Sequence, residues 1–456
     1  MSAPLLNRAA LARLAPALRP AVDPAELRAR IVHFGLGAFH RAHQAVYTEQ
    51  AAARSGEPWG IAAVAPRSVE TVRLLREQDC LYSLTERRPD GNRTRVVGSI
   101  VGALAMGPDA KAADALLTDH EVTVVTLTVT EKGYHRSALT GGLDIAAAPV
   151  AADLAADPHG PLNTVIGRLA AGLAARMRAG APPVSVVSCD NTAGNGAVLR
   201  RVVQDFVRAS AWPDRAEVLD RMSEAVAFPA TVVDRIVPAV GAGDRPAAAA
   251  ALGVRDQLPV TGEPYRQWVL EDSFGAARPP WELDGALFVP DVAPYQLTKL
   301  RLLNGSHSAL AHLGLAAGLT TIAETMAADW GERLVRTLCA EVAPTLPAGG
   351  PDAAAYADDL VVRFTNPGMR HLLQQIATDG PLKIQERWLP ALRELRARGA
   401  DTPVLELALA AWALPYEQPV PALLREAGAA DLADDGALTT TVTARLPALR
   451  AGRIEI

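Results

Sequence analysis

Three residues with chemically useful side chains, Lys299, Asn304 and His307, lie close together in a leucine-rich stretch. The spacing predicts a helix over 292–313 that presents them from adjacent turns. A lysine amine can take the proton of a hydroxyl group if burial or nearby cations lower its pKa. An asparagine amide can stabilise a developing alkoxide, and a histidine can orient the same oxygen. The set suits the oxidation of a secondary alcohol by hydride transfer to a nicotinamide; a solvated helix face is the alternative interpretation.

Polar residues also follow two predicted buried strands. Asp190 and Asn191 come directly after one strand, and Glu131 follows the other. Ligands of open α/β sheets bind beyond the carboxyl ends of parallel strands. We therefore expect Asn191 to supply a second amide donor and Glu131 to face the same cleft. The alternative is that Asp190 and Asn195 cap the next helix.

A glycine turn, Gly35-Leu-Gly37, follows a short apolar strand and precedes a helix. It is not a complete GxGxxG motif, because His40 occupies the third glycine position. Two glycines still allow a tight turn and a close approach to a pyrophosphate, and the N–H groups at the helix start would face that anion. Arg41 is near enough in sequence to contact a phosphate. An ordinary βα turn is the alternative interpretation.

The end of the second predicted strand bears on the choice of cofactor. Sites that prefer NAD usually carry an acid there, which holds the ribose 2′-hydroxyl. This chain has Arg67 instead, with Glu70 three residues later. Arg67 could accept the 2′-phosphate of NADP or stack on adenine. We expect NAD, with NADP left open.

The elements that must position these residues change in type along the chain. The predicted strands cover 31–34, 61–65, 122–129 and 184–189, with a hairpin formed by 81–86 and 94–100. The predicted helices cover 38–53, 69–78, 109–117, 161–178, 199–211 and 216–226. This alternation predicts an α/β fold with a doubly wound, Rossmann-like sheet. From about residue 293 helical periodicity dominates. After a short helical lead-in over 1–29, we therefore expect a dinucleotide-binding domain over 1–285 and an α-helical substrate domain over 286–456.

Composition excludes several classes of protein. The 456 residues carry a net charge of −5 without a long basic run, so we expect no nucleic-acid partner. The three cysteines are far apart, and with the nine histidines they show no zinc-type grouping, so we expect no metal. No uncharged apolar run is long enough for a membrane helix, and the N-terminus has no signal-peptide core. We expect a soluble, cytoplasmic protein, with monomer and dimer both open.

Several longer blocks resemble the mannitol dehydrogenase family of long-chain polyol dehydrogenases, which also includes fructuronate (mannonate) oxidoreductases. The most specific block, Val226 to Pro238, contains Val-Asp234-Arg-Ile-Val-Pro. The other blocks are Phe34-Gly-Leu-Gly-Ala-Phe-His-Arg41, Thr-Val-Thr-Glu131-Lys-Gly-Tyr, Ser-Cys-Asp-Asn191, Glu263-Pro-Tyr-Arg-Gln-Trp and the Lys299, Asn304 and His307 set. The similar blocks extend from about residue 30 to about residue 415.

The resemblance implies a metal-independent dehydrogenase with a nicotinamide cofactor. It implies that Lys299 is the general base, that Asn191 and Asn304 form an amide pair around the reacting oxygen, and that His307 helps to bind it. It also implies that Gly35, Gly37, Phe39 and Asp234 lie near the cofactor and that Lys383 reaches the substrate pocket.

The chain departs from the mannitol-specific pattern at two positions. Gln296 replaces a glutamate three residues before the catalytic lysine, and Gln375 stands where an arginine is usual. The stretch that contains Arg370 and His371 is more similar to the fructuronate branch. The Pro-Arg67-Ser pattern occurs in members thought to use NAD, which favours NAD.

We expect an NAD-dependent enzyme that interconverts a sugar alcohol, of the mannitol or arabinitol type, and its ketose. The alternative within the family is a fructuronate reductase. Its carboxylate substrate would need a convergent cation, such as Arg370 or Lys383, and His371 would lie at the same substrate site. The alternative of another class is a catalytically silent sensor that binds NAD(H).

Overall fold

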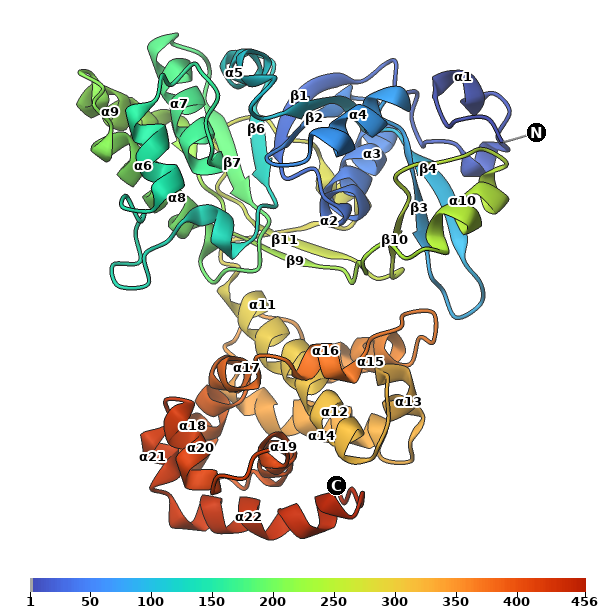
Figure 1. Ribbon diagram of the computed structural model, residues 1–456, viewed down its shortest axis with the longest axis vertical. Helices are drawn as coiled ribbons and strands as arrows, with labels where there is room; N and C mark the ends of the chain where they lie inside the picture. Colours follow the sequence, from blue (N-terminus) through green and yellow to red (C-terminus); the bar gives the residue numbers. More distant parts are fainter. Residues whose placement is uncertain (1–2) are drawn as a thin grey trace. The chain divides into compact units, whose positions relative to one another are not determined.

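The structure is a computed structural model that describes residues 3–456, so Met1 and Ser2, the start of the predicted lead-in, lie outside the described part. The chain forms two compact units, Met1–Val292 and Ala293–Ile456 (Figure 1). We call them the N-terminal unit and the helical unit. The predicted boundary between 285 and 286 lies a few residues before this division.

The N-terminal unit is built around a six-stranded parallel sheet with the strand order β5-β2-β1-β6-β7-β8. Figure 1 labels β1, β2, β6 and β7 of this sheet. Its strands are β1 (Arg28–Phe34), β2 (Trp59–Ala65), β5 (Ile100–Ala105), β6 (Val124–Leu127), β7 (Val184–Ser188) and β8 (Val226–Ala227). The order runs outward in both directions from β1 and β6, which is the doubly wound arrangement of Rossmann-like folds. The predicted fold class of this part is confirmed.

Side chains of the central strands alternate between two apolar cores. Ile31 and Val124 belong to one core, and their neighbours Val32 and Val125 belong to the other. The first core includes α3 (Gln44–Ser55) and α4 (Val69–Glu77), and the second includes α5 (Ala110–Thr118), α7 (Val165–Arg178), α8 (Asn195–Ala209) and α9 (Arg215–Ala225). Burial on both faces explains why these strands are continuous apolar runs in the sequence.

Two three-stranded sheets complete the N-terminal unit. One has the order β10-β3-β4, with β3 (Tyr82–Glu86), β4 (Arg93–Val97) and β10 (Val260–Gly262). The other has the order β12-β11-β9, with β9 (Thr231–Asp234), β11 (Gln267–Glu271) and β12 (Leu287–Val289). The remaining helices are α1 (Arg8–Leu11), α2 (Ala38–Ala42), α6 (Ala148–Ala155) and α10 (Asp244–Leu252), with short 3₁₀ segments at Pro16–Leu18, Glu131–Tyr134 and Trp281–Asp284.

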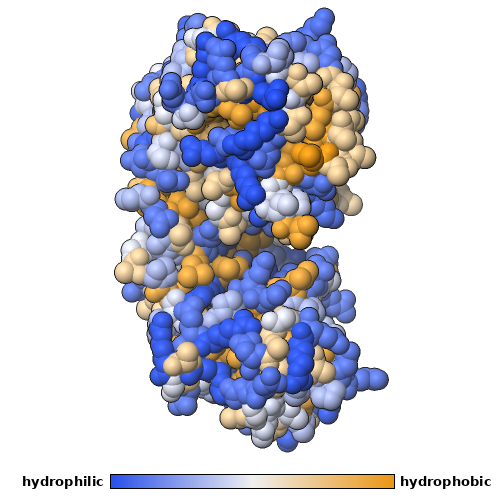
Figure 2. All heavy atoms as spheres, turned by 90° about the vertical axis from the view of Figure 1, so that its left-hand side faces the viewer, coloured by the Kyte–Doolittle hydropathy of each residue, from blue (hydrophilic) through white to orange (hydrophobic). Residues whose placement is uncertain are grey.

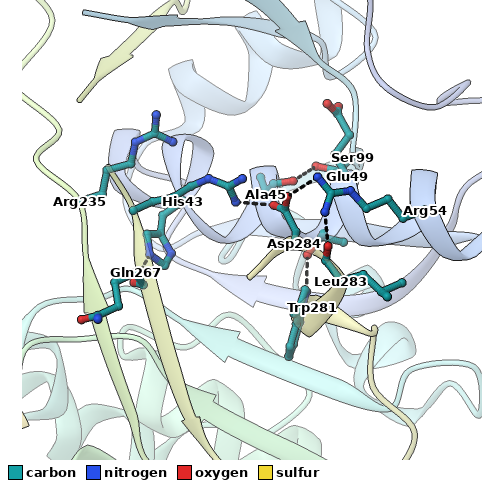
Figure 3. A network of polar contacts seen from close by, with 12 residues as sticks. His43, Ala45, Glu49, Arg54, Ser99, Arg235, Gln267, Trp281, Leu283 and Asp284 are labelled. Atoms are coloured by element: carbon teal, nitrogen blue, oxygen red, sulfur yellow. Dashed lines mark hydrogen bonds and ion pairs between the residues drawn. The ribbon is translucent and has the colours of Figure 1, made fainter. Parts of the chain in front are cut away.

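A polar network holds α3 against the region around β11, and Figure 3 shows its side chains directed toward one another. His43, between α2 and α3, donates from Nε2 to the Gln267 carbonyl oxygen at 2.8 Å. Arg54, in the last turn of α3, donates to the Leu283 carbonyl oxygen and pairs with Asp284 at 3.2 Å. These contacts fix both ends of the helix that follows the glycine turn.

The helical unit is all-α, as predicted, and has one core in which Trp388 and Trp412 are fully buried. Its first part is a continuous helical run of α11 (Ala293–Thr298), the π-helical segment η4 (Lys299–Asn304) and α12 (Gly305–Ala316). The other helices are α13 (Ile322–Ala327), α14 (Gly331–Val342), α15 (Ala353–Phe364), α16 (Leu373–Ala377), α17 (Gly380–Arg387), α18 (Leu389–Ala397), α19 (Pro403–Ala413), α20 (Val420–Glu426), α21 (Ala430–Ala433) and α22 (Gly436–Arg450), with a 3₁₀ turn at Ala343–Thr345.

Several predicted elements of the N-terminal unit differ from the structure. The predicted helical lead-in over 1–29 contains only α1 and a 3₁₀ turn in its described part, and β1 begins at Arg28. The predicted helix over 38–53 is interrupted at His43, where φ is −123° and ψ is −86°. The predicted hairpin strand over 94–100 ends at Val97, and Ile100 already belongs to β5 of the parallel sheet. The predicted helix over 161–178 begins only at Val165, because the Thr164 hydroxyl accepts the Gly167 N–H at 2.9 Å and caps the helix there.

Polar side chains cover most of the surface visible in Figure 2. The face in Figure 2 is mostly hydrophilic, and its apolar side chains form separate patches. Between residues 3 and 456, every helix is too short or too polar to span a membrane.

Candidate functional site

The two glycines of the turn after β1 have different surroundings. Gly35 has φ of +114°, and a Cβ there would overlap the Thr128 carbonyl oxygen. Only glycine combines that backbone conformation with so close an approach. At Gly37, by contrast, the nearest atom to an added Cβ is the Gly35 carbonyl oxygen at 3.8 Å. Gly35 is therefore required by the fold, whereas Gly37 borders open space.

That space is a cavity of about 780 Å³ at the carboxyl ends of the parallel strands. Its walls come from the segments after β1, β2, β6 and β7, with Pro149 from α6, residues 163–165 at the start of α7 and Val233 from β9. The strand order reverses between β1 and β6, and such a switch point is where ligands bind in doubly wound sheets. The volume lies within the usual range for cofactor and small-molecule pockets.

The structure brings five of the predicted site residues to this cavity, which are Gly35, Gly37, Phe39, Arg67 and Asn191. Three others, Arg41, Glu131 and Asp234, are not among the described residues that line it. Lys132, next to Glu131, and Val233, next to Asp234, line it instead.

Arg41 has a structural contact in place of the predicted phosphate contact. Its side chain is buried, its Nη1 donates to the Leu258 carbonyl oxygen at 2.5 Å, and its guanidinium lies over the Tyr82 ring. Burial lowers its pKa. Arg41 thus joins α2 to the segment before β10 and to β3, and it is directed into the protein.

Arg67 is exposed at the cavity, and the nearest acid in sequence is already paired. Both carboxylate oxygens of Glu70 accept from Arg73, at 2.8 and 2.6 Å. Glu70 is therefore paired with Arg73 within its own helix, α4.

A buried histidine that sequence reasoning missed contacts the glycine turn from within β1. His33 lies in β1, with Nδ1 2.7 Å from the Thr126 hydroxyl and Nε2 3.0 Å from the Gly35 carbonyl oxygen. Burial lowers its pKa to about 3. The available signal was a polar residue within an otherwise apolar strand. His43 is also buried, and burial lowers its pKa to about 3.

We expect these histidines to make the protein less stable in acid. Below pH 6.5 the unfolded chain binds protons that the folded chain accepts only near pH 3, so the free energy of unfolding falls as the pH falls through that window. Each histidine contributes about 2 kcal/mol of this loss between pH 7 and pH 5. Urea unfolding at both pH values should show a smaller loss for His33→Gln than for wild type. Equal losses would contradict the assignment.

The polar residues after β7 do not cap α8, so the capping alternative is wrong. The N-cap of α8 is Gly194, without a side-chain cap. The Asn195 amide donates to the carbonyl oxygens of Asp190 and Thr231, both at 3.0 Å, and accepts the Thr231 N–H at 3.0 Å. Asn195 therefore joins the end of β7 to β9 and fixes the loop that carries Asn191.

In the helical unit, the π-helical segment begins at Lys299 and ends at Asn304. In a π-helix the hydrogen bonds join residues i and i+5, so Asn304 lies one wide turn after Lys299. His307 follows one α-helical turn later. A regular helix was predicted here. In the wider π turn, residues five apart in sequence lie nearer the same side of the helix than they do in an α-helix. Such segments occur frequently at functional sites.

His307 lies in a pocket of aromatic and cationic side chains. It stacks on Phe364, with ring centroids 5.3 Å apart, and meets the edge of His371 at 5.5 Å. Burial is the main cause that lowers the pKa of His307 well below 6.5, and repulsion from the ionisable groups of His371, Arg387, Arg363 and Lys383 adds to it. Burial lowers the pKa of His371 to about 4. Both rings are therefore neutral at neutral pH, and each Nε2 is buried without a hydrogen-bond partner among residues 3–456.

Arg387, which sequence reasoning missed, connects these side chains to the helical run that contains Lys299 and Asn304. It donates to the Asn304 carbonyl oxygen at 3.2 Å and to the Ser308 hydroxyl at 2.7 Å. Lys383, one turn earlier on α17, donates to the Ile376 carbonyl oxygen at 2.9 Å. The i, i+4 spacing of the two cations was the available signal. Arg370 is exposed, and no hydrogen bond or ion pair joins it to the described part of the chain.

Across residues 3–456, no group of three or more histidine, cysteine or acidic side chains is arranged to hold a metal ion. The three cysteines are buried and unpaired. Burial raises the pKa of Cys189, which lines the cavity, well above its usual value, so this thiol stays protonated.

Comparisons with known proteins agree with the geometry. The model of the mannitol dehydrogenase Rossmann domain matches residues 29–283, and that of the mannitol dehydrogenase C-terminal domain matches residues 291–423. An uncharacterized oxidoreductase of Escherichia coli, YdfI, is 41% identical over 401 residues, which are 87% of this chain and 81% of that protein. The D-mannonate oxidoreductase of the same organism is 38% identical over 410 residues, which are 87% of this chain and 82% of that protein.

A solved structure is similar over almost the whole chain. The mannitol 2-dehydrogenase of Pseudomonas fluorescens, in a ternary complex with NAD and D-mannitol, is 35% identical with a TM-score of 0.77, and the match covers 98% of this chain and 95% of that one. The predicted resemblance is thus confirmed over both units. The chain belongs to the mannitol dehydrogenase family of oxidoreductases.

Proposed function

We propose that the chain is an NAD-dependent oxidoreductase that interconverts a sugar alcohol, of the mannitol or arabinitol type, and its ketose. The observation that carries the proposal is the π-helical segment that begins at Lys299 and ends at Asn304, because it groups an amine and an amide suited to a reacting hydroxyl. The NAD and D-mannitol complex of the Pseudomonas fluorescens enzyme supports the choice of cofactor and substrate class.

The cavity of the N-terminal unit fits a dinucleotide. Open space beside Gly37 allows a pyrophosphate to approach the backbone. Phe39 and Arg67 offer an aromatic ring and a planar cation for the rest of the cofactor. The nicotinamide, when bound, accepts a hydride from the alcohol carbon or returns it to the ketone. Asp234, next to the lining residue Val233, stays in the proposed cofactor site on family grounds, as does Glu131, next to Lys132.

The side chains of the helical unit would handle the proton and the oxygen. Lys299, as a neutral amine, would take the hydroxyl proton during oxidation and return it during reduction. The Asn304 amide would donate to the oxygen as negative charge develops. The family resemblance assigns the same role to Asn191 of the N-terminal unit. His307 is neutral and can donate a hydrogen bond without adding charge to the site.

A fructuronate reductase is the second candidate, and one observation favours it. Lys383, Arg387 and Arg363 all lie close enough to lower the pKa of His307. A substrate carboxylate would offset this positive charge and form charge-assisted hydrogen bonds with it. His371 belongs to the same pocket, and the D-mannonate oxidoreductase relative is consistent with such a substrate.

A substrate comparison tests these proposals. We expect NADH to reduce a ketose such as fructose, and NAD to oxidise mannitol or arabinitol, with turnover followed by absorbance at saturating cofactor. Fructuronate and NADPH are assayed in parallel. Selective turnover of fructuronate would establish the second candidate. Tight NADH binding without turnover of any of these substrates would instead identify a silent sensor and reject the enzymatic proposal.

A further inference from the structure

Thr130 has a backbone conformation that threonine rarely adopts. It follows β6 in the cavity wall, and its φ and ψ are +69° and +161°. This region is occupied almost entirely by glycine, because a Cβ clashes with the backbone there. Such strain persists only when surrounding contacts hold it in place. The contacts that hold Thr130 therefore help to set the shape of the cavity wall.

The Asp190 carboxylate supplies these contacts from the neighbouring strand end. One oxygen accepts the Thr130 N–H at 2.9 Å. The other accepts the Val129 N–H at 3.1 Å and the Tyr134 hydroxyl at 2.8 Å. The Tyr134 hydroxyl is also 2.5 Å from the Ser188 hydroxyl. Asp190 thus gathers three donors from both sides of Thr130.

The chemistry of the contacts requires a carboxylate. An ionised aspartate offers acceptors only, and here all three partners donate to it. An asparagine has nearly the same shape, but its NH₂ group would face one or two of these donors. Asp190→Asn would therefore lose one or two of these three hydrogen bonds with almost no change in side-chain volume.

The segment that Asp190 holds, from Val129 to Tyr134, is joined to the glycine turn through Thr128. The Thr128 hydroxyl donates to the Gly35 carbonyl oxygen at 2.9 Å, and the Thr128 carbonyl oxygen fills the space where Gly35 lacks a side chain. A shift of the segment at Thr130 would therefore pass through Thr128 to the turn. Asp190 and Asn191 both line the same cavity.

We propose that Asp190 is a positioning residue that holds Thr130 in its positive-φ conformation and thereby shapes the wall of the cofactor cavity. This inference rests on the proposed function, since the ligand of the cavity is taken to be NADH. Asp190 need not touch the cofactor, because it acts through the backbone of the segment after β6.

The test is a set of NADH fluorescence titrations on the full chain. Asp190→Asn should weaken NADH binding about tenfold or more, as loss of these hydrogen bonds lets Thr130 relax. Thr130→Gly is the reference for the double variant, because glycine adopts this conformation freely and both variants lack the Thr130 side chain that lines the cavity. The double variant should recover the affinity lost in Asp190→Asn and bind NADH about as tightly as Thr130→Gly. A residue that only stabilises the fold would show no such recovery.

Each outcome decides between the alternatives. Asp190→Asn with wild-type affinity, or a double variant as weak as Asp190→Asn, would overturn the inference and leave the proposed function standing. Circular dichroism and melting temperatures of the cofactor-free proteins report on folding. If Asp190→Asn does not fold, the double variant must fold and bind NADH, and its failure would overturn the inference. A wild-type chain that does not bind NADH would overturn the proposed function as well.

Discussion

Replacing Lys299 with alanine should lower kcat by about two to four orders of magnitude and leave NADH binding nearly unchanged. The amine is the proposed acceptor of the hydroxyl proton, and alanine offers no group to replace it. Lys299 lies in the helical unit, whereas every residue that lines the dinucleotide-sized cavity belongs to the N-terminal unit. The substitution should therefore change kcat without changing the affinity for NADH.

Stopped-flow or steady-state turnover at saturating NADH gives kcat, and fluorescence titration gives the affinity for NADH. Lys111→Ala, at an exposed position of α5, is the matched control for loss of a lysine charge and should behave as wild type. Small primary amines added to Lys299→Ala should restore part of the turnover, as they supply a proton acceptor. Near-normal kcat in Lys299→Ala without added amine would reject its role as general base.

The regular part of the fold could be predicted from the sequence because burial leaves a direct pattern. Strands covered on both faces are apolar without interruption, and the N-terminal predictions at β1, β2, β6 and β7 are confirmed within a few residues. The break at His43 could not be predicted. It depends on the bond from His43 to Gln267, which lies more than two hundred residues away. Helical spacing likewise predicts a helix around Lys299 but does not distinguish a π turn from an α turn.

The candidate site was predictable where it depends on local order along the chain. A residue directly after a strand reaches the carboxyl edge of the sheet, and Arg67 and Asn191 do so. Proximity in sequence was insufficient for Arg41, since a helical residue near the turn can face the protein interior. The supporting residues Arg387 and His33 were missed because their partners come from other elements. The sequence shows the i, i+4 spacing of Lys383 and Arg387, but the partners of Arg387 and His33 follow from the tertiary fold.

The two glycines of the turn should respond in opposite ways to substitution. Gly37→Val should fold normally and bind NADH at least about a hundredfold more weakly, a loss of about 2.7 kcal/mol. Its backbone is extended, with φ of −96° and ψ of 179°, which valine adopts readily, and the added methyl groups would extend into the open space that the pyrophosphate needs.

Gly35→Ala is the contrasting variant. Its Cβ would overlap the Thr128 carbonyl oxygen, and its φ of +114° disfavours any side chain, so we expect a lower melting temperature of the cofactor-free protein. Melting temperatures and NADH titrations on both variants separate the two effects. If Gly37→Val bound NADH as tightly as wild type, the cavity beside the glycine turn would not be the pyrophosphate site. The cofactor would then have to bind elsewhere, since a valine in that space and a phosphate group against the Gly37 backbone exclude one another.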